Sequence, residues 1–546
     1  MAARRDVGTS LRPGDQPADA RLADLAQARR RRAGTIGPML RFGTAGLRGP
    51  MRPGPDGMNI ATVSTATWAV ARVLKDRRLG RSTVVVGRDA RHNSADFALA
   101  TAEVLAAEGF SVVLLPDPLP TPVLAFAVRE LNAAAGVQIT ASHNPAGDNG
   151  YKVYFDGGIQ IVSPTDVEIE AAIAAAPPVA DIARTPVLPA DTELIQRYIA
   201  RAATVRRGEH PVRVALTAMH GVGGATALAV LRRAGFDDVH VVPEQFEPDP
   251  DFPTVAFPNP EEPGAADAVL ALAAEVGADL AIALDPDADR CAVGVTTPAG
   301  WRMLSGDETG WLLGDHVLAG LAPEAAERSV VASTVVSSRL LAAIAAEYGA
   351  THVETLTGFK WLARADADLP GKTLVYAYEE AIGHCVDPAA VRDKDGISAA
   401  VLACDLVATL KAARRTALDV LDDIAGRHGV HLTSAVTVRA DDAAAALAAL
   451  RAAPPATLAG APAVVEDLQQ RPGPDGTDAL IIAANRADAS VRMVVRPSGT
   501  EPKLKFYLAV SRAPETPVAP ARAAAEALCD ELVGAARQLG DRLLSG

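Results

Sequence analysis

A regular alternation of short β-patterned runs and longer helical segments most constrains how this 546-residue chain can fold. The runs are rich in Val, Ile and Ala, and they end in residues typical of turns. Parallel strands joined by helices produce this order, so the sequence predicts α/β units around largely parallel sheets. The predicted strands are residues 82–86, 111–115, 134–140, 212–217, 279–284, 330–335 and 373–378, and the predicted helices include 60–75, 96–108, 193–206, 338–348 and 397–416.

The pattern changes near residue 430, where an Ala-rich helix (441–453), paired β runs and a final helix (517–544) follow one another. A chain of this length is expected to hold three or four domains. We therefore predict five segments: an N-terminal extension with one helix (20–32), three α/β domains and a last domain of a different type. Their boundaries are 1–40, 41–206, 207–325, 326–428 and 429–546.

Composition excludes several classes of protein. The formal net charge of -13 argues against a general nucleic-acid binder. No apolar run approaches the length of a membrane helix, and the N-terminus lacks the apolar core of a signal peptide. The four cysteines form no CxxC pair and fit a reducing compartment, so we expect a cytoplasmic protein with no membrane partner. We expect a monomer or a weak homo-oligomer.

The first candidate site is the loop within QITASHNPAGDNGYKVYF, residues 138–155. It places Ser142 beside His143 at the end of a predicted strand, and Lys152 lies on the next β run. A hydroxyl, an imidazole and a lysine on a tightly bent loop are typical of a nucleophile site. The alternative is an ordinary polar loop. Ser142 is expected to be an exposed loop hydroxyl, so its replacement by Ala should cost little stability even if it is the nucleophile.

Two further stretches indicate anion and metal binding. The glycine-rich segment 41–59 places backbone N–H groups and Arg48 where they could contact an anion, although a simple turn is an equal alternative. Asp285, Asp287 and Asp289 alternate on the loop after strand 279–284, where three carboxylates repel one another unless a cation lies among them. The spacing is not that of an EF-hand, and oxygen ligands with a position left open suit Mg²⁺.

Polar groups also follow later strands. Glu380 and His384 lie in EEAIGH after strand 373–378 and could contact sugar hydroxyls, although paired glutamates are often surface features. Near them, Gly358 and Lys360 lie in TGFKW, and Lys394 lies in a charged loop. The segment RPSGTEPK resembles a phosphate cradle, because an Arg, hydroxyls and backbone N–H groups can satisfy phosphate oxygens. The cradle residues are Arg496, Ser498, Gly499 and Thr500.

These motifs together resemble those of the α-D-phosphohexomutase superfamily, which includes phosphoglucomutases and phosphomannomutases. FGTAGLRG, TASHNPAGDNGYK, DPDADR, GFKW with EEAIGH, and RPSGTEP occur in the family's order from about residue 41 to the C-terminus. The resemblance implies three similar α/β domains with mixed sheets, plus a C-terminal α+β domain, around a central cleft.

The resemblance also implies residue roles. Ser142 matches the serine that carries a phosphoryl group, flanked by His143 and Lys152, and Arg48 matches the opening loop. The implied Mg²⁺ ligands are Asp285, Asp287 and Asp289, with an oxygen on Ser142. The implied substrate contacts are Arg290, Gly358, Lys360, Glu380, His384, Lys394, Arg496, Ser498, Gly499 and Thr500.

The implied reaction interconverts hexose 1-phosphate and hexose 6-phosphate through phosphoserine and a hexose 1,6-bisphosphate, which also serves as activator. Arg48 and His143 are both candidates for proton transfer. The sugar loop has Ile382 where many members have Ser, which leaves glucose, mannose and pentose open and makes phosphopentomutase the main alternative. A serine hydrolase is a weaker alternative, because no G-x-S-x-G motif surrounds Ser142. A binding protein without catalytic activity is also weaker, because it would not need Ser142 together with three aspartates.

Overall fold

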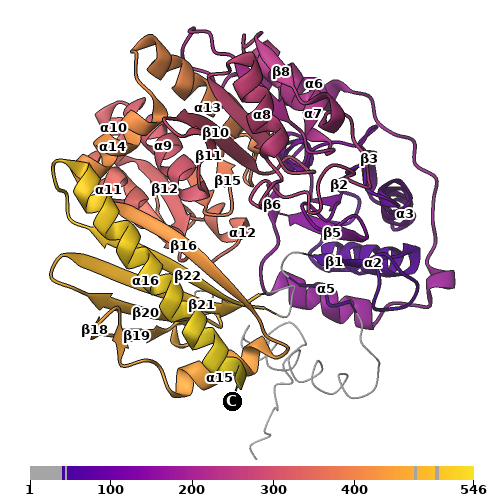
Figure 1. The fold of residues 1–546 in the computed structure, drawn as a ribbon. Coiled ribbons are helices and arrows are strands. Elements are labelled where there is room, and N and C mark those ends of the chain that lie inside the picture. The colour runs from indigo at the N-terminus through magenta and orange to yellow at the C-terminus, as the bar shows by residue number, and fades with distance from the viewer. Residues whose placement is uncertain (1–39, 44–45, 156, 472–475, 499–502, 546) are drawn as a thin grey trace, which may run out of the picture.

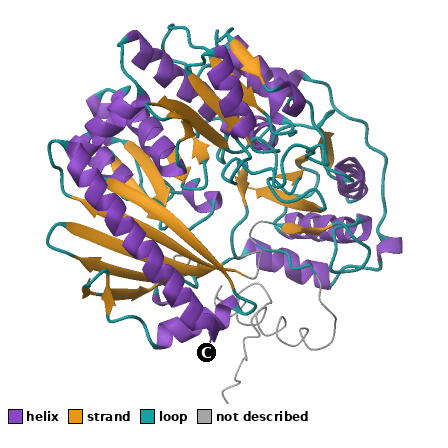
Figure 2. Cartoon of the chain, viewed as in Figure 1, coloured by secondary structure: helices purple, strands orange, loops and turns teal. Residues whose placement is uncertain are grey.

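The computed structural model describes residues 40–43, 46–155, 157–471, 476–498 and 503–545. The predicted helix 20–32, Gly499 and Thr500 therefore lie outside the described residues. Four larger sheets with their helices follow one another along the chain, from the indigo and purple first unit to the orange and yellow last unit (Figure 1). Helices cover the sheets throughout (Figure 2).

The first sheet combines parallel and antiparallel pairs. Its strands are β1 (Leu47–Pro50), β2 (Thr83–Arg88), β3 (Ser111–Leu114), β4 (Ala135–Ile139), β5 (Asp148–Phe155) and β6 (Ile159–Gln160). The order is β1-β5-β4-β2-β3, with β6 paired to β5. β2 is parallel to β3 and β4, whereas β5 runs antiparallel to β1 and β4. The helices of this unit are α2 (Ile60–Asp76), α3 (Ser94–Ala107), α4 (Thr121–Glu130), α5 (Thr165–Ala174) and α6 (Glu193–Ala203).

The second and third sheets repeat this plan. The second contains β7 (Val214–Thr217), β8 (Val239–Val241), β9 (Leu280–Leu284), β10 (Cys291–Thr297) and β11 (Gly300–Met303), in the order β11-β10-β9-β7-β8. The third contains β12 (Ser329–Thr334), β13 (Thr351–Thr355), β14 (Thr373–Glu379) and β15 (Gly383–Cys385), in the order β13-β12-β14-β15. β10 and β15 run antiparallel to their neighbours β9 and β14.

The expectation of largely parallel sheets was therefore wrong, and the mixed sheets that the family resemblance implied are confirmed. In each unit a parallel strand is followed by a tight loop and an antiparallel return strand: β4 to β5, β9 to β10 and β14 to β15. No helix intervenes at these points, so strand–helix alternation alone does not reveal the return strand.

The helices of the second and third units are α7 (Gly223–Arg233), α8 (Asp267–Val276), α9 (Gly306–Ala319), α10 (Pro323–Glu327), α11 (Leu340–Glu347), α12 (Phe359–Leu362), α13 (Gly396–Ala412) and α14 (Ala417–His428). The helix predicted over 397–416 is present as α13, but it ends at Ala412. The chain turns at Arg414, which has a φ of 57°, and Thr416 then caps α14 with Asp419. α9 packs against α11 and β14, so the helix before the predicted boundary at 325 belongs with the third sheet.

The last unit is an antiparallel α+β domain, as expected. Its main sheet has the order β16-β22-β21-β20-β19, and α16 lies along β16 and β22 (Figure 1). Its elements are β16 (His431–Arg439), α15 (Ala443–Ala452), β17 (Thr457–Leu458), β18 (Ala461–Pro462), β19 (Val464–Asp467), β20 (Leu480–Asn485), β21 (Ala489–Pro497), β22 (Lys503–Arg512) and α16 (Val518–Ser545). Short 3-10 helices occupy Val179–Asp181, Pro243–Gln245 and Leu468–Gln470.

The packing of the core separates the last unit from the others. One continuous apolar cluster joins the first three units through side chains such as Tyr198, Leu284 and Tyr376. The last unit has its own cluster between its sheet and α16. A small apolar cluster connects the two parts. In it, Val335 and Val336 of the third unit pack against side chains of the last unit. The loops of the first three units are consequently fixed relative to one another.

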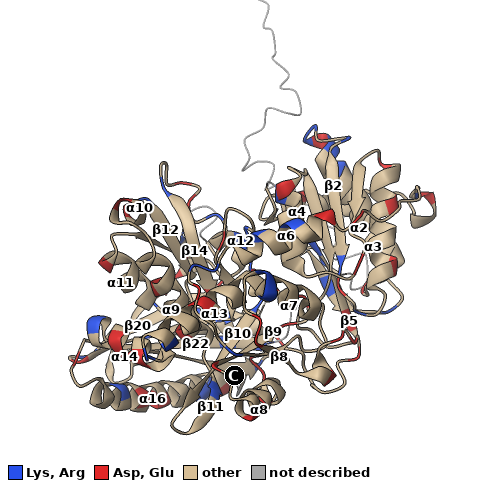
Figure 3. Ribbon diagram, turned by 90° about the horizontal axis from the view of Figure 1, so that it is seen from above, with Lys and Arg blue, Asp and Glu red and all other residues tan. Residues whose placement is uncertain are grey.

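Basic and acidic residues are interspersed along the ribbon (Figure 3). Among the described residues, no single helix combines the length and the apolar character needed to cross a membrane. α13 and α14 meet that criterion only when they are counted together across a 90° bend.

Candidate active site

The return loops of the first two units bring their polar residues into direct contact. The loop from β4 to β5 carries Ser142, and the loop from β9 to β10 carries the three aspartates. The Ser142 hydroxyl donates a hydrogen bond of 2.7 Å to Asp285 Oδ2. The third loop, from β14 to β15, joins the second through an antiparallel bridge between Arg290 and Gly383. Structurally equivalent loops of three units thus converge on one site.

Ser142 is held in an unusual conformation. Its φ of 52° lies in the left-handed region that non-glycine residues rarely adopt. Its backbone N–H donates to Thr140 Oγ1 at 2.9 Å, and its Oγ lies 3.2 Å from His143 Nδ1. The expected exposed hydroxyl was wrong: Ser142 is only 3% exposed, because the aspartate loop of the second unit covers it.

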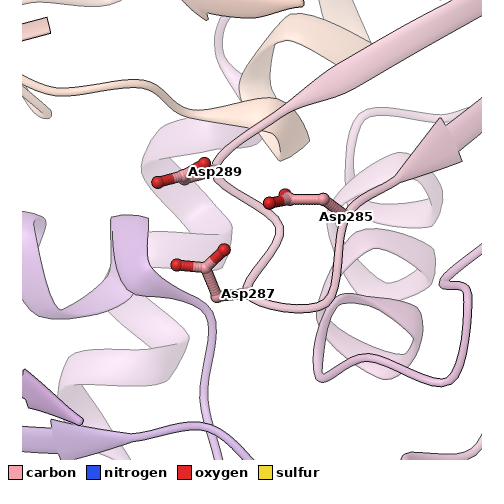
Figure 4. Close-up of side chains that lie close together, drawn as sticks. All are labelled: Asp285, Asp287 and Asp289. Atoms are coloured by element: carbon pink, nitrogen blue, oxygen red, sulfur yellow. The ribbon is translucent and has the colours of Figure 1, made fainter. Parts of the chain in front are cut away.

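The aspartates form a buried group whose free oxygens suit a metal ion. One ligand oxygen from each of Asp285, Asp287 and Asp289 lies within 4.8 Å of the others (Figure 4). The Oδ1 atoms of Asp287 and Asp289 are buried and receive no hydrogen bond from the described residues. Buried carboxylate oxygens without donors are unfavourable unless a cation binds them. Hard oxygen ligands of this kind fit Mg²⁺.

Lysines neutralise the opposite side of the aspartate group. Lys152 Nζ donates to Asp287 Oδ2 at 2.6 Å and to Asp289 Oδ2 at 2.8 Å. Lys394 Nζ lies 3.1 Å from Asp289 Oδ2. Burial acts to raise the pKa of Asp287, but the charge of Lys152 and the hydrogen bonds from Lys152 and Thr121 together outweigh burial and hold the pKa below its usual range. The same two aspartates outweigh burial at Lys152 and raise the pKa of its ammonium group.

Three more predicted residues surround Ser142. Burial, together with the charges of Arg290 and Arg48, holds the pKa of His143 well below 6.5, so its imidazole is neutral. Arg48 Nη1 donates to Asn144 Oδ1 at 3.2 Å, and burial lowers the pKa of its guanidinium. Arg290 lies with its Nη1 at 3.6 Å from Glu261 and its Nε at 4.0 Å from Asp289.

The sugar loop is only partly as expected. The carboxylate of Glu380 accepts hydrogen bonds of 2.9 Å from Thr334 and Ser337, and burial raises its pKa. Glu380 and Ile382 border a cavity of about 570 Å³ whose wall includes Lys505 of the last unit. His384 does not line this cavity: it is fully buried beside Tyr376, and burial lowers its pKa to about 3.

The predicted phosphate cradle meets the third unit. Arg496, at the end of β21, donates from Nη1 to Thr357 Oγ1 at 2.7 Å, and the neighbouring Gly358 is the N-cap of α12, with a φ of 103°. Burial lowers the pKa of Lys360 to about 8, and the charges of Arg364 and Arg496 contribute to that shift. The Ser498 backbone N–H donates to the carbonyl of Lys503 at 2.8 Å, which closes the described part of the loop.

Sequence reasoning missed two residues that contact the site loops. Thr121 donates from Oγ1 to Asp287 Oδ2 at 2.5 Å, and no sequence signal distinguishes it from other residues that begin helices. Arg91 donates to four backbone carbonyls of the serine loop. Arg91 lies just beyond the carboxyl end of β2, where open α/β sheets place ligand contacts.

Known proteins with similar sequences belong to a family that has this arrangement of units. Three family models, described as phosphoglucomutase/phosphomannomutase α/β/α domains I, II and III, match residues 39–179, 196–298 and 305–426. A Haemophilus influenzae protein named "Probable phosphomannomutase" is 41% identical over 463 residues, which cover 83% of this chain and 93% of that protein. The human phosphopentomutase is 38% identical over 432 residues, which cover 73% of this chain and 70% of that protein.

A solved structure has the same fold. The phosphoglucomutase/phosphomannomutase family protein from Burkholderia thailandensis has a TM-score of 0.68 and 20% identity, and the match covers 91% of this chain and 97% of that chain. At this level of identity the match concerns the fold alone. It includes the last unit, which lies outside the three family models.

Proposed function

Because this chain belongs to the phosphoglucomutase/phosphomannomutase family of the α-D-phosphohexomutase superfamily, and is thus a phosphotransferase-type isomerase, we propose that it moves a phosphoryl group between two hydroxyls of one sugar through Ser142. The contact of 2.7 Å between the Ser142 hydroxyl and Asp285 carries this proposal. It joins the candidate nucleophile of one unit to the candidate metal ligands of another.

Asp285, Asp287 and Asp289 would hold Mg²⁺ together with an oxygen on Ser142, since two of their buried oxygens lack a donor within the part of the chain that the structure describes. Bound Mg²⁺ supplies positive charge that offsets the charge of a transferring phosphoryl group. Lys152 lies on the same carboxylates and holds them in place. Electrostatic preorganisation of this kind is the main source of catalysis in phosphoryl transfer.

The proposed transfer involves only the phosphorylated enzyme and the sugar phosphate. The bond between phosphorus and Ser142 Oγ breaks as a free sugar hydroxyl forms a new bond to phosphorus, and the proton of that hydroxyl moves to a base. Ser142 Oγ takes up a proton as it leaves, and neutral His143, at 3.2 Å from Oγ, can deliver it; Arg48 is the second candidate for proton transfer. The resulting bisphosphate turns around and returns its other phosphoryl group to Ser142.

The turn requires a second phosphate subsite at a distance from Ser142. Arg496 and Lys360 bring positive charge from two units to one place and suit this role. Ser498, Gly499 and Thr500 would complete the subsite. The last unit has its own apolar core, and this separate packing supports a role as a movable lid that opens for the turn.

We propose hexose phosphates of the glucose or mannose type as first substrates, with a hexose 1,6-bisphosphate as activator. A relative that is 41% identical over 83% of this chain is named as a probable phosphomannomutase. A pentose 1-phosphate is the second candidate. Ile382 favours it, because this side chain packs in an apolar cluster and offers no hydroxyl to a sugar, and relatives named as phosphopentomutases support it.

A coupled assay tests the proposal. With Mg²⁺ and a trace of glucose 1,6-bisphosphate, we expect turnover of glucose 1-phosphate or mannose 1-phosphate, and ribose 1-phosphate measured alongside decides between the sugars. Ser142→Ala should abolish turnover while removing the donor to Asp285, at a cost of about 1–3 kcal/mol of stability. Full activity in that variant would exclude Ser142 as the phosphoryl carrier.

A further inference from the structure

Arg91 lies beneath the serine loop and binds its backbone at four points. Its Nη2 donates to the carbonyls of Ser142 and Asn144, each at 2.6 Å. Its Nη1 donates to the carbonyls of Pro145 at 2.8 Å and Asp148 at 3.2 Å. One planar guanidinium thus fixes both ends of the loop that carries the nucleophile. A lysine, with a single ammonium group, cannot reproduce this set of contacts.

Arg91 is itself held rigidly from the side away from the loop. Its side chain is 1% exposed, and its Nε lies 3.4 Å from Asp89 Oδ2. The carboxylate of Asp89 also accepts from the Arg91 backbone N–H and from Ser94. The guanidinium lies over the ring of Phe252 from the second unit, at 5.0 Å from the ring centre. Arg91 therefore connects the serine loop to the unit that carries the aspartates.

We infer that Arg91 is a positioning residue for phosphoryl transfer. Ser142 has a φ of 52°, which is strained for a residue with a side chain, so the loop needs an external restraint to keep it. Arg91 provides that restraint and aims Oγ at the site of transfer, while the distal phosphate subsite lies on other units. The inference rests on the proposed role of Ser142.

The rate of Ser142 phosphorylation tests this inference. Each protein is mixed with glucose 1,6-bisphosphate, and phosphorylation of the Ser142 peptide is followed by rapid quench and mass spectrometry. We expect Arg91→Met to be slower by about 100-fold, since a shift of about 1 Å in a reacting group has an effect of this size. The concentration of bisphosphate at half-maximal rate should change by less than about 3-fold, because Arg91 does not bind the distal phosphate.

Arg206 offers a matched control. It donates to the backbone carbonyls of Gly208, Ala234 and His210 at 2.6, 2.6 and 3.0 Å, and it lies over the ring of Phe236 at 4.1 Å. Arg206→Met therefore removes the same kinds of contact at a place remote from the serine loop. We expect it to lower the thermal midpoint while the phosphorylation rate of the folded protein stays within about 3-fold of wild type.

Arg91→Lys decides the question if Arg91→Met does not fold, because it keeps the charge and loses the forked geometry. A rate at least about 10-fold below wild type, with an unchanged half-saturating concentration, supports the inference. A rate equal to wild type overturns it, as does a slowing in Arg206→Met equal to that in the Arg91 variant. A wild-type protein that turns over without phosphorylation of Ser142 would instead overturn the proposed function, and the inference with it.

Discussion

Replacement of Lys152 by methionine should destabilise the protein in a way that depends on Mg²⁺. Lys152 is 7% exposed and donates to Asp287 and Asp289, which are almost fully buried. Methionine fills a similar volume but leaves the two carboxylates without that cation. Removal of one partner from a buried ion pair costs about 3–5 kcal/mol. Bound Mg²⁺ should reduce this cost, since a divalent cation supplies the missing positive charge.

The expected shift is measurable by calorimetry. The first three units share one apolar core and form a large cooperative body, for which about 2 °C per kcal/mol is appropriate, so we expect the midpoint to fall by about 6–10 °C without Mg²⁺. In excess Mg²⁺ the fall should be distinctly smaller. Mutase turnover should also drop, because Lys152 no longer holds the aspartates.

Lys411→Met provides the control for loss of a lysine. Lys411 pairs with Asp279 at 2.7 Å, but its side chain is 55% exposed. Exposed pairs contribute at most about 1 kcal/mol, so the midpoint should fall little and by the same amount with and without Mg²⁺. An equal fall for Lys152→Met in both conditions would refute our reasoning about charge compensation at the aspartates. An unchanged midpoint in Lys152→Met would refute it as well.

Three further predictions follow from the site and its surroundings. Arg496→Ala should weaken binding of sugar 1-phosphate and sugar 6-phosphate alike in equilibrium titrations, and an effect on one isomer only would contradict the turn of the bisphosphate. Ile382→Ser should raise kcat/KM for hexose relative to pentose phosphates by about 10-fold if a sugar hydroxyl gains a partner, and an unchanged ratio would exclude this position as a selectivity determinant. Burial lowers the pKa of His352 to about 4, so the unfolded chain binds a proton that the folded protein does not, and stability falls as the pH drops from about 6.5 towards 4. His352→Gln should make that fall shallower by about 1.4 kcal/mol per pH unit, measured by urea unfolding at several pH values, and an unchanged slope would show that this histidine titrates alike in both states.

The structure also explains why some local predictions were wrong. Ser142 was expected on an exposed loop because Asn, Pro and Gly follow it. Burial depends on the second unit, whose aspartate loop is distant in sequence and covers the hydroxyl. His384 was expected to face a sugar, but β15 directs it into the core beside Tyr376. The side on which a strand residue points depends on register, which short motifs do not fix.

The kinds of chemistry and the order of the units could be predicted from local sequence. Alternating apolar runs predicted the α/β units, and the spacing of Asp285, Asp287 and Asp289 predicted a cation site, because local sterics and charge repulsion act between near neighbours in the chain. Only the tertiary structure decided that each site loop joins a parallel strand to an antiparallel return strand, and that Thr121 and Arg91 contact those loops. Their contacts join segments that are far apart in sequence, so they exist only once the units have packed together.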